Sequence, residues 1–105
     1  MVTGKWAGGR TGIFREENGK DRKSYGGKAV GDKGEAAIGT YDGYDVLLYA
    51  IVDMFRTGKV PVTAEETLEL YTFMEAADES KRRNGAEVTL KEVLDKARAE
   101  VAAKP

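Results

Sequence analysis

The chain has 105 residues, of which 41% are hydrophobic and 33% charged, and its formal net charge is −1. This length allows one domain or part of one, and a net charge near zero gives no sign of a nucleic-acid or membrane partner. The absence of cysteine and histidine excludes disulfides, thiol nucleophiles and zinc sites built from those ligands.

The chain changes character near residue 40. Residues 1–40 hold ten of the 13 glycines and eight Lys/Arg against five Asp/Glu, whereas residues 41–105 hold nine basic residues against thirteen acidic ones. We therefore expect an α+β fold made of a Gly-rich hairpin region, 1–40, followed by a helical region, 41–105. No apolar run is long enough to span a membrane and no signal-peptide pattern opens the chain, so we expect a cytoplasmic protein without a membrane partner.

The first predicted hairpin joins strands at 11–16 and 20–25 around Asn18-Gly19, a strong turn signal. We prefer a three-residue loop to a two-residue one, because it places Glu16 opposite Lys20 rather than opposite another acidic residue.

A second predicted hairpin joins strands at 28–30 and 35–38, whereas residues 1–10 show no periodicity and are expected to be flexible or held by a neighbour. Strands this short cannot bury a face by themselves, so the hairpins need the helices or another chain. Their edges also invite pairing with a partner sheet.

The first predicted helix, 43–57, is the most apolar stretch of the chain. Gly58 is expected to end it in a left-handed conformation. The apolar residues at helical spacing on one face are Tyr44, Leu47, Leu48, Ile51, Met54 and Phe55. Because residues 46–52 are apolar throughout, we expect this to be the core helix, covered on more than one side.

Two more helices, 64–83 and 90–102, are predicted from capping boxes that begin at Thr63 and Thr89. Asn84-Gly85 ends the first of them. Its expected inward set is Thr67, Leu68, Leu70, Tyr71, Met74 and Ala77. The expected apolar stripe of the last helix is Leu90, Val93, Leu94, Ala97 and Val101.

No residue pattern indicates catalysis, cofactor binding or a metal site. The dinucleotide fingerprint and the P-loop are both missing from the sequence. The carboxylates of the second helix, Glu65, Glu66, Glu69, Glu75, Asp78 and Glu79, are interpreted as a capping residue and a solvated face. Lys81-Arg-Arg83 is interpreted as a helix C-terminus, where the dipole repels anions.

Two weaker patterns also have structural explanations. Basic residues around Trp6, within 5–28, interleave with acidic ones, so a nucleic-acid arm is not favoured. Tyr41 and Tyr44 are typical structural anchors, and they are also our candidates for lining a substrate pocket.

The helical region resembles the C-terminal end of one enzyme family. The matching string is Gly43-Tyr-Asp-Val-Leu-Leu-Tyr-Ala-Ile-Val-Asp-Met-Phe-Arg-Thr-Gly-Lys59, then Pro61-Val-Thr-Ala-Glu-Glu-Thr-Leu-Glu-Leu-Tyr-Thr-Phe-Met-Glu-Ala-Ala-Asp-Glu-Ser-Lys-Arg-Arg-Asn-Gly85 and Val88-Thr-Leu90. Together with the Gly31-Asp-Lys-Gly34 turn, it is similar to the Gfo/Idh/MocA oxidoreductases, the family of glucose-fructose oxidoreductase and inositol 2-dehydrogenase.

The resemblance implies that the chain is a partial C-terminal domain of a sugar or polyol dehydrogenase. In that family an N-terminal Rossmann domain binds NAD or NADP, and the C-terminal α+β sheet domain forms a pocket wall and commonly the subunit interface. The family's fingerprint, its Glu-Lys-Pro lysine and its Asp/His pair have no counterpart here, so no catalytic residue is carried over. NAD or NADP is implied for the full-length parent, not for this chain.

We therefore expect no catalysis by this chain alone, and homo-oligomerisation through the sheet edges or the first helix. The alternative is a small stand-alone, non-enzymatic dimerisation module.

Overall fold

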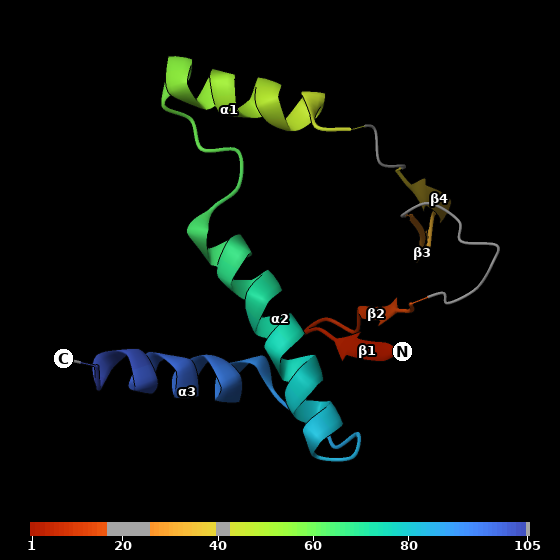
Figure 1. Cartoon of the computed structure of the whole chain (residues 1–105). Coiled ribbons are helices and arrows are strands. Elements are labelled where there is room, and N and C mark those ends of the chain that lie inside the picture. The colour runs from red at the N-terminus through yellow and green to blue at the C-terminus, as the bar shows by residue number, and fades with distance from the viewer. Residues whose placement is uncertain (17–25, 40–42, 105) are drawn as a thin grey trace. The chain divides into compact units, whose positions relative to one another are not determined.

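The computed structural model describes residues 1–16, 26–39 and 43–104 (Figure 1). It contains two antiparallel hairpins followed by three helices, which confirms the α+β fold expected from the sequence. The described residues fall into two compact units, one ending at Lys59 and the other beginning at Val60.

The first hairpin pairs β1 (Val2–Lys5) with β2 (Thr11–Phe14) in antiparallel register, with Val2 opposite Phe14. The strand in β2 was predicted, but its partner β1 was not: residues 1–10 were expected to be flexible or held by a neighbour, and residues 2–5 form a strand held by β2. The reason is local, because β-branched residues open β1 and two glycines in left-handed conformations close the turn. The predicted strand 20–25 and the loop before it lie outside the described residues.

The turn of this hairpin is fixed by backbone hydrogen bonds. Trp6 N–H donates to the Arg10 carbonyl at 2.9 Å, and Gly9 N–H donates to the Trp6 carbonyl at 3.2 Å. The Trp6 ring then lies against Gly12 in β2, where a side-chain Cβ would come within 2.9 Å of indole Cζ3. Glycine at position 12 is therefore what allows the ring to lie across the strand.

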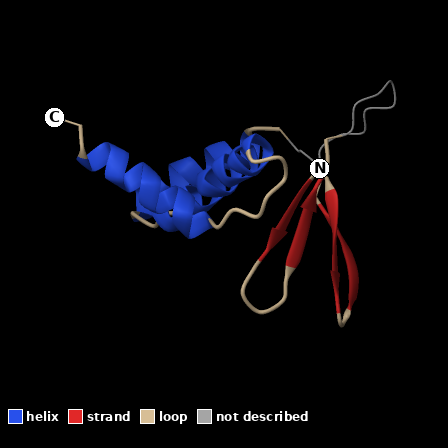
Figure 2. Cartoon of the chain, turned by 90° about the horizontal axis from the view of Figure 1, so that it is seen from below, coloured by secondary structure: helices blue, strands red, loops and turns tan. Residues whose placement is uncertain are grey.

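The second hairpin pairs β3 (Gly27–Gly31) with β4 (Gly34–Ile38) and confirms the predicted strand pair. Gly31 stands opposite Gly34, so the connection is a two-residue turn, and Figure 2 shows each hairpin as one pair of red strands. All residues of β3 and β4 are exposed. This agrees with the expectation that short strands cannot bury a face alone.

Helix α1 (Asp45–Thr57) begins two residues later than predicted and ends as predicted. Gly58 is left-handed, with φ of 72°, and its N–H donates to the Met54 carbonyl at 2.8 Å. Every residue of α1 is exposed or half-exposed. The first unit therefore does not supply the cover expected for a core helix, and cover by another chain stays a prediction.

Helix α2 (Ala64–Arg82) begins with the predicted capping box. The Thr63 hydroxyl accepts a hydrogen bond from Glu66 N–H at 3.1 Å, and the Glu66 carboxylate accepts from Thr63 N–H at 2.9 Å. Asn84 and Gly85 follow with positive φ and end the helix, as the sequence predicts.

Helix α3 (Leu90–Ala102) shows only half of its predicted capping box. Thr89 accepts from Glu92 N–H at 3.1 Å. The Glu92 carboxylate accepts instead from Arg83 Nη2 at 2.7 Å, a charge-assisted hydrogen bond that links α3 to the end of α2.

The buried residues lie where α2 and α3 pack together. Thr72 and Ala76 on α2 and Val93 on α3 are each 7–8% exposed. The buried Thr72 hydroxyl is satisfied, because it donates to the Leu68 carbonyl at 2.6 Å. Small side chains on α2 thus let α3 approach closely, at a helix face that the sequence analysis did not select.

The inward set predicted for α2 is consequently wrong for most of its large apolar members. Leu68, Leu70, Tyr71 and Met74 are 48–66% exposed. Their apolar spacing is real, but α3 packs on the side with small residues. On α3 the predicted stripe is covered only at its start, since Val93 is buried while Val101 is 67% exposed.

Candidate functional site

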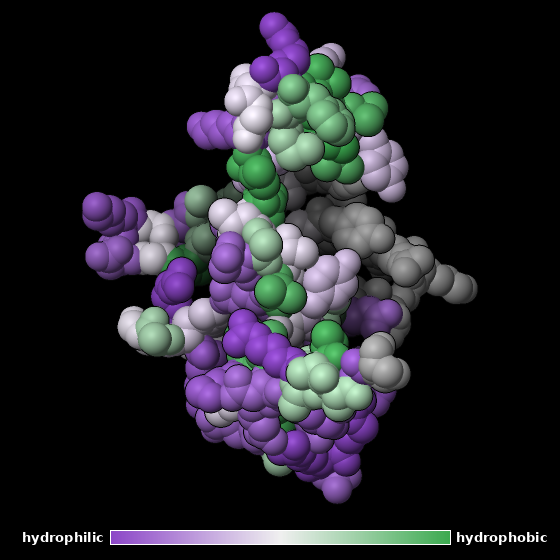
Figure 3. All heavy atoms as spheres, turned by 90° about the vertical axis from the view of Figure 1, so that its left-hand side faces the viewer, coloured by the Kyte–Doolittle hydropathy of each residue, from purple (hydrophilic) through white to green (hydrophobic). Residues whose placement is uncertain are grey.

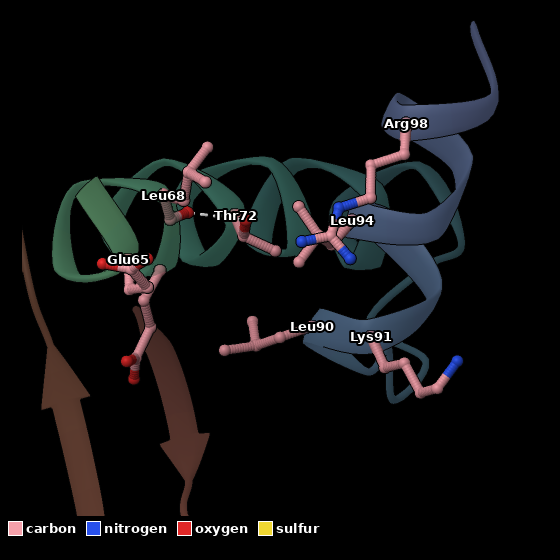
Figure 4. Close-up of a pocket in the computed structure, with 8 residues that line it drawn as sticks. Glu65, Leu68, Thr72, Leu90, Lys91, Leu94 and Arg98 are labelled. Carbon is pink, nitrogen blue, oxygen red and sulfur yellow. Dashed lines mark hydrogen bonds between the residues drawn. The ribbon is translucent and has the colours of Figure 1, made fainter. Parts of the chain in front are cut away.

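A groove of about 200 Å³ opens between α2 and α3, within the second unit. Figure 4 shows Leu90 and Arg98 of α3 extending toward α2, whereas the Lys91 side chain points away from α2. The lining residues are Glu65, Leu68, Glu69, Thr72, Leu90, Lys91, Leu94 and Arg98. Three leucines give the groove an apolar floor.

Charged residues of both signs are among those that line the groove. Glu65 and Glu69 come from α2, and Lys91 and Arg98 come from α3. The Lys91 ammonium forms an ion pair with Asp95 one turn further along α3. This hydrogen bond, with a smaller attraction from Arg98, lowers the pKa of the Asp95 carboxyl below its ordinary value.

A cluster of ion pairs joins α2 and α3 near the turn between them. Glu79 accepts hydrogen bonds from Arg82 Nε at 2.7 Å and from Arg83 Nε at 2.8 Å. These bonds lower the pKa of the Glu79 carboxyl, and Arg82 contributes more than Arg83. Arg83 also forms an ion pair with Glu92 of α3. The cluster therefore links the two helices across residues 84–89.

The pKa values of the two arginines are raised by the same contacts. The Arg82 pKa is raised by hydrogen bonds to Glu75 and then Glu79, and the Arg83 pKa by hydrogen bonds to Glu92 and then Glu79. Both guanidinium groups are therefore ion-paired with carboxylates of the same chain. This favours the structural interpretation of the basic run that ends α2 over an anion site.

The carboxylates of α2 also have structural partners. Glu66 belongs to the capping box, and Glu75 and Glu79 pair with Arg82. Within residues 1–16, 26–39 and 43–104, no three acidic side chains come together in a way that could hold a metal ion.

The two tyrosines proposed as pocket residues fall in different places. Tyr44 immediately precedes α1, is 69% exposed, and its carbonyl accepts from Leu48 N–H at 3.0 Å. Tyr41 lies outside the described residues. The pocket role of this pair therefore stays a prediction.

The α1 surface is the most apolar of the first unit. Val46, Leu47, Leu48 and Val52 are 53–67% exposed and Phe55 is 80% exposed. Figure 3 shows green spheres gathered at the top of the view, over α1, whereas the bottom of the view is mainly purple. Contiguous exposed apolar surface of this kind is uncommon in proteins that act as single chains.

Sequence reasoning missed the groove, because it ranked positions by large apolar side chains. The signal was present in Thr72 and Ala76, two small residues one helical turn apart on α2. Such a pair predicts the place of closest helix approach.

Comparison of the chain with protein-family models, with curated proteins and with solved structures gave no significant match. No helix in the described part of the chain combines the length and apolar character needed to cross a membrane.

Proposed function

We propose that this chain is the C-terminal part of an NAD(P)-dependent sugar or polyol oxidoreductase similar to the Gfo/Idh/MocA family. It contributes an oligomer interface and part of a substrate-pocket wall. The cofactor site and the catalytic residues belong to a Rossmann domain of the parent protein. The resemblance in the string from Gly43 to Leu90 is the reason for naming this family.

The observation that supports the proposal best is the exposure of α1. Burying apolar surface contributes about 25 cal/mol per Å², so a helix that leaves its leucines, valines and phenylalanine in water lacks its main source of stability. An α+β domain that is completed by another polypeptide accounts for this exposure. The same feature also agrees with the stand-alone dimerisation module.

Two measurements test the proposal against that alternative. The reading frame upstream of Met1 is expected to encode a Rossmann sequence with a Gly-rich dinucleotide fingerprint. A frame that begins at Met1 contradicts the proposal and favours the stand-alone module.

Titration of NADH and NADPH into the purified chain is the second measurement, with nicotinamide fluorescence as the readout and an intact dehydrogenase as positive control. We expect no binding in the sub-millimolar range, because the phosphate-binding glycine fingerprint is missing from this sequence. Saturable sub-millimolar binding shows that the cofactor site was assigned to the wrong part of the protein.

A further inference from the structure

We draw no further inference here: the strongest candidate, the exposed apolar surface of helix α1 in the first unit, carries none because nothing in the described part of the structure shows what covers it.

Discussion

At the scale of single residues, Glu79 is the acceptor that both arginines at the end of α2 share. Its carboxylate accepts hydrogen bonds from two arginines, which lower its pKa below the ordinary value of 4.5. A carboxyl whose pKa is lowered by folding stabilises the folded state above its unfolded pKa and loses that contribution as it becomes protonated.

We therefore predict that the thermal stability of the α2–α3 unit falls as the pH drops below about 4.5. Glu79→Gln is expected to lower stability at neutral pH and to remove part of this acid dependence. The rest of the acid dependence is expected to remain, because the pKa of Asp95 is also lowered. Thermal melts followed by circular dichroism from pH 3 to pH 7 check this. Glu87→Gln, outside the cluster, serves as control, and an acid profile identical in wild type and Glu79→Gln contradicts the assignment.

Gly12 is the second residue whose role can be isolated. A Cβ at this position meets the Trp6 ring at 2.9 Å and 3.2 Å. Gly12→Ala is expected to push the indole off β2 and shift tryptophan emission to longer wavelength, because the ring becomes more hydrated.

Trp6 is the only tryptophan, so the emission of the chain reports this contact directly. The control is Gly31→Ala, where the added Cβ meets open space. An unchanged spectrum in Gly12→Ala means that the ring is not held against the strand.

At the scale of elements, Ala76 sets the distance between α2 and α3. It is 7% exposed at the helix contact, so a larger side chain forces the helices apart. We predict that Ala76→Leu destabilises the unit by about 1–3 kcal/mol, the usual cost of overpacking.

Urea denaturation followed by circular dichroism measures this change. Ala77→Leu is the matched control, because Ala77 is the next residue along α2 and is only half-buried. Equal effects of the two substitutions would show that Ala76 is not at the closest approach.

The helix ends could be predicted from the sequence because their causes are local. Thr63 with Glu66 and the Asn84-Gly85 pair each act within a few residues, and the structure has both where the sequence placed them. The face of each helix that packs on another helix could not be predicted in this way. An apolar face on α2 and a small-residue face on α2 are both visible in the pattern, and only the position of α3 decides which one is buried.

The same distinction explains the strands and the groove. The β3–β4 pair follows from a two-residue turn between short β-prone segments, whereas β1 opens with only two β-branched residues and was overlooked. The groove depends on the angle and spacing of two helices. No single segment contains that information.

At the scale of the whole molecule, α1 has more exposed large apolar side chains than any other described element. Its polar residues Asp45, Tyr49, Asp53 and Arg56 share one narrow side at helical spacing, which leaves the wider part of the circumference apolar. A single helix packed on one side cannot cover such an arc, and this favours burial in a larger assembly.

We predict that Leu48→Glu weakens self-association of the chain by about tenfold or more, since fully burying one leucine contributes about 1.5–3 kcal/mol. Tyr49→Glu, on the polar side of α1, is expected to change association little. Sedimentation equilibrium measures both. If Tyr49→Glu has the larger effect, the interface lies on the opposite side of α1.

The packing between elements also determines how the chain folds. Three pairs of described elements make extensive contacts, namely β1 with β2, β3 with β4, and α2 with α3, and each pair is adjacent in the sequence. Local contacts of this kind form rapidly, because little chain entropy is lost in closing the loops between them.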